Sequence, residues 1–356
     1  MKVEYAEGGS VRRPMPDWLV KLIWPVAALG LLLAFNLAFT SLFFRVEWRD
    51  GHLYGSLIDV LNRGSPVMLL ALGMTLVIAT GGVDLSVGAV MAISGAVAAE
   101  LINRKTVGFP PYFHIVEVPV TFPLVIALSL GAAVLAGIWN GTLVGLFKIQ
   151  PIVATLILMV AGRGVAQLIT GGQYTTFTDA KLVYVGNGHW LGFPFPVTMV
   201  LVMLLVTALL TRRTALGLFI ECVGDNEKAT HYAGISSRAV KFMAYVFTGL
   251  CAGLAGLVAV SNIKCADSNH AGLFLELDAI LAVVVGGTAL TGGRYYLLGS
   301  IVGALLIQTL TTTMYMRNVS PEIAPVPKAI VIVAVCLLQS PVFRNQMRRI
   351  AKWRPA

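Results

Sequence analysis

Long stretches of uncharged, apolar residues are the feature that most constrains how this chain can fold. Hydrophobic residues make up 57% of the 356 residues and charged residues only 12%, whereas soluble domains carry roughly 25% charged residues. The apolar excess is gathered in blocks of about 18 or more residues, the length that a helix needs to cross a bilayer. Lipid offers the backbone no hydrogen-bond partners, so such blocks must be helical or shielded. The sequence therefore predicts an all-α, polytopic integral membrane protein.

Ten candidate membrane segments can be read from the sequence. They are residues 22–44, 65–82, 85–101, 118–147, 149–170, 193–211, 242–263, 279–293, 295–316 and 323–343. The segments 65–82 and 279–293 are short, which is typical of tilted helices or of broken, re-entrant ones. The chain is accordingly divided into a tail of residues 1–21, a transmembrane domain of residues 22–343 and a basic tail of residues 344–356.

The net charge of +9 is concentrated in three basic clusters that flank apolar blocks. The clusters are Lys2, Arg12, Arg13 and Lys21; Arg212, Arg213, Lys228, Arg238 and Lys241; and Arg344, Arg348, Arg349, Lys352 and Arg354. Ten crossings place all three clusters on one side, as the positive-inside rule requires of cytoplasmic segments. We therefore expect both termini to be cytoplasmic, with no cleaved signal peptide at the start. Cations arranged in this way do not indicate binding of nucleic acid.

The sequence lacks the motifs of an enzyme. It contains no GxxxxGK[ST] phosphate loop, so if ATP drives this protein, another chain must bind the ATP. It contains no CxxC pair and no His, Cys, Asp or Glu cluster with metal-ligand spacing, and the five histidines fall in predicted connectors. We expect no catalytic residue, cofactor or metal.

A few ionisable residues lie in or beside the apolar blocks: Asp84, Glu100, Arg163, Glu276, Asp278 and Lys328. A charge at mid-bilayer costs about 2.5–3.5 kcal/mol, so each is a candidate functional residue. Asp84, with Ser86 behind it, precedes a helical pattern, which favours capping over a proton relay. Arg163 is expected to pair with a carboxylate or with carbonyls of another helix, with substrate contact as the alternative. Glu276 and Asp278 are expected at the outer rim.

Two glycine-rich turns form a faint internal repeat. Residues 80–88 contain Gly82, Asp84 and Ser86, and residues 286–293 contain Gly287 and Gly293. Each turn follows a short apolar block, and six crossings lie between them, so both face the same side. Transporters are often built from such repeats, with discontinuous helices near the substrate. The five residues are candidate gating turns; the alternative is that glycine turns simply recur.

Asn140 and Arg163 are further candidates for the translocation path, although a polar membrane residue such as Asn140 usually bonds another helix. The small residues Gly249, Gly253 and Gly256 are interpreted as packing positions that let helices approach closely.

A polar loop of residues 214–238 lies between two apolar blocks. Within it we single out Gly224, Asp225, Asn226, Glu227, Lys228, Ala229 and Gly234. Either Asp225 or Asn226 can cap a short helix that Gly234 ends. This cytoplasmic helix is either a solvated surface element or a docking element for a cytoplasmic partner.

Several motifs together resemble one family. Residues 81–88, 141–172, 224–235, 276–280 and 286–293 resemble the permeases of ribose/xylose/arabinose-type (carbohydrate uptake 2) bacterial ABC sugar importers, and the similarity extends from about residue 61 to residue 340. Within that family, residues 49–55, 156–170 and 266–272 look most like galactofuranose importer permeases.

The resemblance implies a permease subunit that moves a sugar from periplasm to cytoplasm through the bacterial inner membrane. It implies a separate cytoplasmic ABC ATPase, a periplasmic sugar-binding protein and a second permease subunit, identical or homologous. It also implies that residues 224–234 form the helix that couples to the ATPase. The alternative left open by the residues is a secondary ion-coupled carrier that uses Asp84 or Arg163.

Overall fold

The computed structural model describes residues 17–40, 43–49, 51–104, 120–320, 322–323 and 325–339. The helices are α1 Asp17–Phe39, α2 Ser56–Ala79, α3 Val87–Arg104, α4 Phe122–Gly141, the π-helix η1 Thr142–Leu146, α5 Pro151–Thr170, α6 Ala180–Asn187, α7 Phe195–Arg213, α8 Leu216–Asp225, α9 Glu227–Tyr232, α10 Ser237–Ile263, α11 Leu275–Val285, α12 Leu297–Met316 and α13 Pro325–Gln339. Most of the predicted N-terminal tail and all of the C-terminal tail lie outside the described residues.

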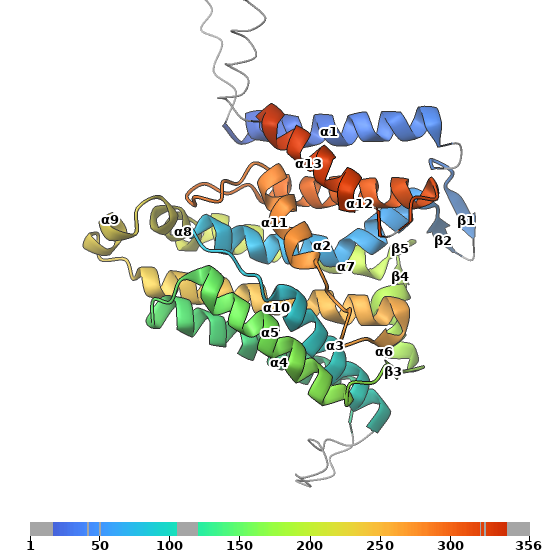
Figure 1. Cartoon of the computed structure of the whole chain (residues 1–356), viewed down its shortest axis with the longest axis horizontal. Coiled ribbons are helices and arrows are strands. Elements are labelled where there is room, and N and C mark those ends of the chain that lie inside the picture. The colour runs from blue at the N-terminus through green and yellow to red at the C-terminus, as the bar shows by residue number, and fades with distance from the viewer. Residues whose placement is uncertain are drawn as a thin grey trace, which may run out of the picture.

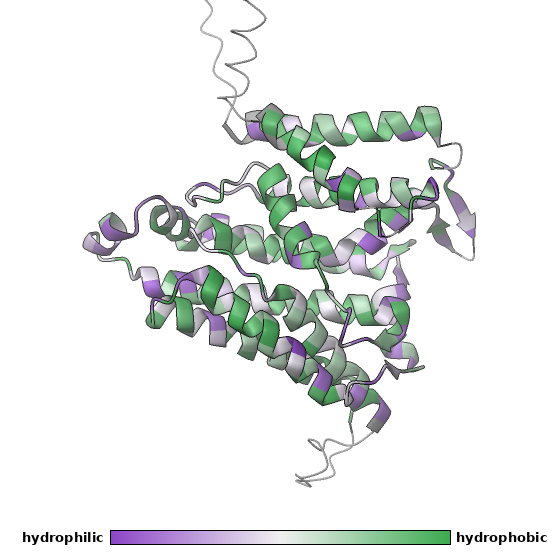
Figure 2. Cartoon of the chain, viewed as in Figure 1, coloured by the Kyte–Doolittle hydropathy of each residue, from purple (hydrophilic) through white to green (hydrophobic). Residues whose placement is uncertain are grey.

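Short strands form three two-stranded hairpins or ladders. β1 Glu47–Arg49 pairs with β2 His52–Tyr54, β4 His189–Trp190 pairs with β5 Phe193–Pro194, and β3 Thr175–Thr176 pairs with β6 Cys265–Ala266, all antiparallel. Figure 1 shows these strands at one end of the molecule and α8 and α9 at the other, with the long helices running between. Figure 2 shows that the long helices between the two ends consist mainly of apolar residues. The prediction of a mainly helical fold is confirmed, with the short strands as an addition that the sequence did not predict.

Seven helices of the described part are long and apolar enough to cross a membrane, namely Lys21–Phe39, Ser56–Ala79, Phe122–Leu146, Pro151–Thr170, Phe195–Arg213, Ser237–Ile263 and Leu297–Met316. The prediction that the segment 65–82 is short is wrong, because α2 begins at Ser56 and has 24 residues. The segment 279–293 is short, since α11 has 11 residues and ends at Val285. At 1.5 Å per residue it extends about 16 Å, roughly half of a hydrocarbon core.

α2 and α10 form the centre of the bundle. In the apolar window of α2, 83% of the residues are buried, against 11% for α1 and 22% for α5. Small residues let α10 approach its neighbours closely: a Cβ on Gly249 would lie 2.6 Å from the Ala133 carbonyl oxygen of α4, and one on Gly253 would lie 2.6 Å from the Ala133 Cβ. Gly256 meets Met91 of α3 in the same way. The predicted packing role of these glycines is confirmed.

Two helices, α3 and α11, begin inside the bundle and not at one of its ends. The chain leaves α2 beside α8, returns toward the middle as a non-helical segment of residues 80–86, and there starts α3 (Figure 1). Residues 267–274 enter from the opposite end, the end of the hairpins, and start α11. The two helix starts meet, since a Cβ on Gly88 would collide with the carbonyl oxygen of Gly272. Each of these two stretches is therefore part non-helical segment and part helix.

Candidate functional site

The turn before α3 is organised by the buried Asp84. Its Oδ1 accepts hydrogen bonds from the Ser86 backbone N–H at 2.9 Å and from the Ser86 hydroxyl at 2.6 Å. The first of these closes a turn directly ahead of the helix, as a capping residue does. From α4, Asn140 donates its Nδ2 to Ser86 Oγ at 2.8 Å and to Asp84 Oδ1 at 3.4 Å. Asp84, Ser86 and Asn140 are thus brought together as the candidates for one site.

α10 holds the other side of this turn. The Tyr245 hydroxyl donates to the Val83 carbonyl oxygen at 3.2 Å. A Cβ on Gly82 would lie 2.7 Å from the same hydroxyl, so only glycine fits there without a shift. One acceptor remains open, because Asn140 Oδ1 is buried without a hydrogen-bond partner among the described residues.

Glu276 lies at the point where α3 and α11 begin. It is 3% exposed, and its Oε2 has no hydrogen-bond partner in the described part of the chain. A Cβ on Gly88 would lie 2.5 Å from that oxygen. The expectation of an outer-rim Glu276 is therefore wrong: the non-helical segment 267–274 carries the start of α11 inward, which sequence hydropathy alone does not reveal. Near it, Asp278 forms an ion pair with Lys328 of α13 at 2.9 Å.

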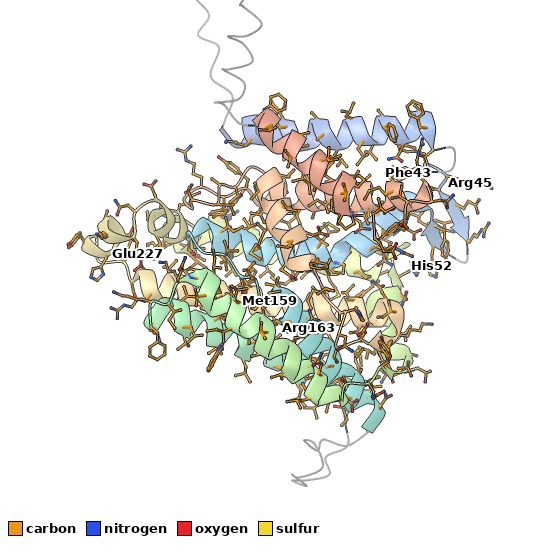
Figure 3. The ribbon with its side chains drawn as sticks, viewed as in Figure 1. Phe43, Arg45, His52, Met159, Arg163 and Glu227 are labelled. Atoms are coloured by element: carbon orange, nitrogen blue, oxygen red, sulfur yellow. The ribbon has the colours of Figure 1, made fainter. Side chains whose placement is uncertain are left out.

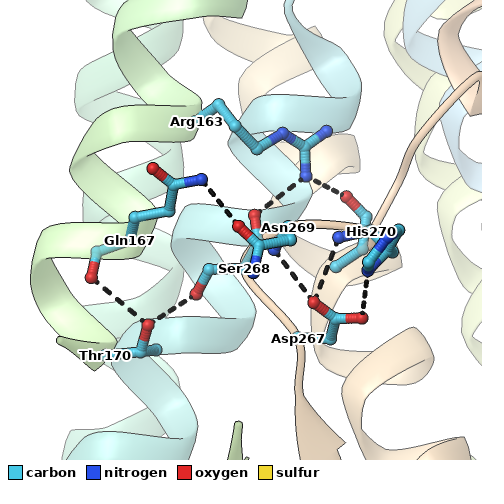
Figure 4. Close-up of polar contacts among 8 residues, drawn as sticks. Arg163, Gln167, Thr170, Asp267, Ser268, Asn269 and His270 are labelled. Atoms are coloured by element: carbon cyan, nitrogen blue, oxygen red, sulfur yellow. Dashed lines mark hydrogen bonds and ion pairs between the residues drawn. The ribbon is translucent and has the colours of Figure 1, made fainter. Parts of the chain in front are cut away.

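A polar face of α5 holds that inward segment in place. Arg163 Nη1 donates to the carbonyl oxygens of Ala271 at 2.5 Å and Ser268 at 3.3 Å. One turn along, Gln167 Nε2 donates to Asn269 Oδ1 at 2.7 Å, and the hydroxyls of Thr170 and Ser268 are bonded at 2.8 Å. Figure 4 shows these contacts converging on one loop. Arg163 thus pairs with carbonyl groups, as expected, but these belong to the loop 267–274 and not to another helix.

The same loop is stiffened from within. Asp267 Oδ1 accepts from the backbone N–H groups of Asn269 at 2.9 Å and His270 at 3.1 Å, and Asp267 Oδ2 contacts His270 Nδ1 at 2.8 Å (Figure 4). The loop therefore has a fixed shape against α5. Sequence analysis did not single out Gln167 or Thr170, although their spacing of four and seven residues from Arg163 puts them on one helical face.

At the opposite end, three glycine-containing segments meet backbone to backbone. The Gly293 N–H donates to the carbonyl oxygen of Ala79, the last residue of α2, at 2.9 Å. A Cβ on Gly224 of α8 would collide with both of these groups. A Cβ on Gly292 would lie 2.9 Å from Gly81 N and 3.0 Å from the Gly224 carbonyl oxygen. The turns 80–88 and 286–293 thus meet each other, and the predicted coupling segment lies against both.

The predicted coupling helix is two short helices. α8 ends at Asp225, and Asn226 caps α9, because Asn226 Oδ1 accepts from the Ala229 N–H at 3.0 Å. Of the two predicted capping residues, the structure uses Asn226. Inside the turn, the Thr230 hydroxyl donates to the Cys222 carbonyl oxygen at 2.7 Å, joining α9 to α8. Gly234 follows α9 with φ +83°, as expected of a residue that ends a helix.

Glu227 joins α9 to α10. Its Oε2 accepts from Lys241 Nζ at 2.7 Å, and this hydrogen bond lowers the pKa of Glu227, so the carboxylate is ionised at neutral pH. Neighbouring Lys228 and Ala229 are exposed. Figure 3 shows Glu227 at the α9 end, away from Arg163 and Met159 on α5. The coupling segment and the polar turn of Asp84 are therefore separate sites, linked by α2 and the glycine contacts.

The last candidate lies apart from both sites. Gly287 has φ +97°, and its nearest neighbour is Lys21 of α1, with 3.3 Å between a Cβ on the glycine and the lysine Cβ. Among the described residues no group of three or more His, Cys, Asp or Glu side chains could hold a metal ion.

Comparisons with known proteins place the chain among transport proteins. The galactofuranose transporter permease protein of Escherichia coli (strain K12) is 50% identical over 92% of this chain and 93% of its own length. The fructose import permease protein of Bifidobacterium longum (strain NCC 2705) is 37% identical over 91% of this chain and 89% of its own. The ribose import permease protein of Escherichia coli (strain K12) is 36% identical over 80% and 85%. No solved structure matches the chain.

A family description fits as well. Residues 56–336 match the family described as branched-chain amino acid transport system / permease component, and these residues include the polar turn, the α5 face and the coupling segment. The predictions of a multi-pass membrane permease and of a non-enzymatic translocation subunit are confirmed. The chain belongs to the branched-chain amino acid transport system / permease component family.

Proposed function

We propose that this chain is the membrane-spanning permease subunit of an ATP-binding-cassette importer that moves a sugar, with galactofuranose as the first candidate, from periplasm to cytoplasm. The observation that carries the mechanism is the contact of Gly224 with Ala79 and Gly293. It joins a polar helix pair at one end of the bundle to both glycine turns. Movement of that helix pair by a partner would be transmitted to the start of α3 and to the α11–α12 turn.

The sugar assignment rests on the relatives. Three permeases that are 36–50% identical to this chain are named for galactofuranose, fructose and ribose. Several charged groups in the described middle of the bundle are bound to neighbours: Arg163 to two carbonyl groups, Asp84 to Ser86 and Asn140, and Asp278 to Lys328. Glu276 keeps one carboxylate oxygen without a partner in the described part of the chain, so the choice of an importer over an ion-coupled carrier rests on the sugar permeases to which the chain is similar.

A second permease subunit is part of the proposal. α5 is only 22% buried in its apolar window, yet Arg163 and Gln167 lie on its half-buried face. Polar side chains at membrane depth normally face protein or a water-filled cavity. A second permease packed on this face would enclose them, and the sugar path would then run between the two subunits, beside the loop 267–272.

The proposed partners also include a cytoplasmic ATPase and a periplasmic binding protein. The sequence has no phosphate loop of its own, and the exposed surface of α9 offers the ATPase a contact. We expect the purified chain alone neither to hydrolyse ATP nor to move sugar in liposomes. Adding its ATPase and binding protein should restore sugar uptake that depends on ATP and ignores a proton ionophore. Proton-driven uptake by the chain alone would contradict the proposal.

The proposed topology has ten crossings and two cytoplasmic ends. α3 and α11 complete their crossings with the non-helical segments 80–86 and 267–274, so α11 is counted as a crossing although it is short. The count puts α9 and the hairpin of β4 and β5 on opposite sides.

This topology can be tested by cysteine labelling. In a background without native cysteines, Lys228→Cys should react with a membrane-impermeant maleimide only in inverted vesicles. Leu191→Cys, at a position 81% exposed in the β4–β5 hairpin, should react only from the outside of intact cells. Labelling of both positions from the same side would refute the ten-crossing topology.

A further inference from the structure

A cavity of about 530 Å³ opens beside the coupling segment. It lies where α9, the first turns of α10, the end of η1 and the start of α5 come together, at the left of Figure 1. Four cationic side chains line it, Lys148, Lys228, Arg238 and Lys241, and one carboxylate, Glu227. His231 also lines the cavity. With His231 neutral, the lining carries a net charge of +3, four cations less one anion. Nothing in the proposed coupling mechanism accounts for this excess.

The cations of this basic pocket are not balanced from within. Glu227 already accepts from Lys241 at 2.7 Å. The side chains of Lys228 and Arg238 make no ion pair or hydrogen bond to the part of the chain that the structure describes. Lys148 acts on the same Glu227 only through its charge. The Glu227 carboxylate is therefore the counter-charge of both Lys241 and Lys148. Lys228 and Arg238 have no counter-charge in the pocket. Such a pocket favours an anion with several acceptor oxygens.

The rim on one side of the basic pocket is apolar and uncovered. Leu146 and Phe147, immediately before Lys148, are 56% and 70% exposed, and Ile152 and Val153 at the start of α5 are 44% and 46% exposed. They continue the exposed apolar surface of α5. The pocket is therefore at the level where the apolar surface gives way to charge, with cations facing inward and an apolar strip leading away from them.

We propose that the basic pocket binds the phosphate-bearing headgroup of an anionic phospholipid, with the acyl chains lying along Leu146, Phe147 and Val153, beside the α5 face that the second permease subunit covers. The cations supply the counter-charge, and the strip of Leu146, Phe147, Ile152 and Val153 supplies the apolar contact that a free phosphate does not need. Basic pockets between membrane helices on the cytoplasmic side are suited to such headgroups. The bound lipid would brace α9 against α10 and η1. The cytoplasmic placement rests on the proposed function.

The binding can be measured on the full-length chain within its transporter complex. The complex is placed in nanodiscs that contain equal phosphatidylglycerol and phosphatidylcholine, then extracted, and the retained lipids are counted by native mass spectrometry. The wild-type chain should retain phosphatidylglycerol in preference to phosphatidylcholine. Each cation near an anionic membrane surface contributes about a fivefold factor. Arg238→Gln should therefore weaken retention about fivefold, and Lys148→Gln with Arg238→Gln about 25-fold.

The matched control is Arg213→Gln. Arg213 is also an exposed arginine at a helix end on the same side of the bundle, but it does not line the pocket, so its loss should leave retention unchanged. Arg238→Lys should keep the preference, which separates charge from shape. Equal retention by wild type and the double variant would overturn the proposal, and so would displacement of the lipid by millimolar inorganic phosphate, which would mark a free-phosphate site. Retention is read without ATP or sugar, so a failure of transport alone would count against the proposed function and not against this pocket.

Discussion

Replacing Gly224 with valine is expected to reduce sugar transport to background while the permease remains folded in the membrane. The Cβ of any residue at this position would meet the Ala79 carbonyl oxygen and the Gly293 amide nitrogen. Both are backbone atoms, so no rotamer change can make room. They are also the two groups of the 2.9 Å hydrogen bond that joins α2 to the 286–293 turn. A side chain there must push α8 away from both turns, and the link proposed to carry the ATPase movement is lost.

The measurement is sugar uptake and ATP hydrolysis per folded complex. Wild type and Gly224→Ala, which adds a smaller side chain at the same position, are measured in parallel. We expect hydrolysis to persist while uptake is lost, because the ATPase itself is unchanged. The matched control is Gly234→Asn in the same loop. Gly234 has φ +83° and no atom within 4 Å of a Cβ, and asparagine tolerates this conformation. Normal uptake by Gly224→Val together with loss of uptake by Gly234→Asn would show that the glycine contact carries no coupling.

The helices could be predicted from the sequence, but several of their ends could not. Each of the ten apolar segments contains a helix, because a block without charges has no other stable form in lipid. The start of α2 was predicted nine residues late, at 65 and not at 56. Asp59, Asn62 and Arg63 lower the hydropathy of a helix that continues beyond the apolar block. α10 likewise starts at Ser237, with Arg238 and Lys241 in its first turns. Hydropathy indicates where the apolar part of a helix begins, but the helical hydrogen bonding can begin several residues earlier.

The candidate site could be predicted in part, where the deciding interaction is local. The Asp84 turn and the cap on α9 are contacts over two or three residues, and local pattern indicates them. The contact of Gly88 with Gly272 joins residues 184 positions apart. No local pattern encodes it, so the burial of Glu276 was missed. The junction of Ala79, Gly224 and Gly293 is of the same kind. Its glycines were noticed one by one, but their shared contact depends on how the helices pack.

A substitution at Asp84 separates the importer from the carrier. The carboxylate is 2% exposed and accepts from the Ser86 N–H, the Ser86 hydroxyl and Asn140. Asp84→Ala removes the acceptor and leaves buried donors without a partner, at a cost of about 1–3 kcal/mol for each. We expect a clearly lower Tm of the detergent-purified permease and little protein in the membrane. Asp84→Asn keeps an acceptor oxygen for the Ser86 donors, replaces the other oxygen by an amide NH2 group and cannot ionise.

The asparagine variant is therefore the deciding measurement. If Asp84 shapes the turn that starts α3, Asp84→Asn should assemble with its partners and retain most of the ATP-dependent uptake, far above Asp84→Ala. If Asp84 relays a proton, an amide cannot replace it, and uptake should vanish in a permease whose Tm is close to that of wild type. Uptake is compared per folded complex, with Asn140→Asp as a second variant that adds a carboxyl beside Asp84. Because two carboxylates in one buried site repel each other, that variant should lose stability under the turn role. A stable Asp84→Asn permease without uptake would restore the ion-coupled carrier and remove the structural role argued for this turn.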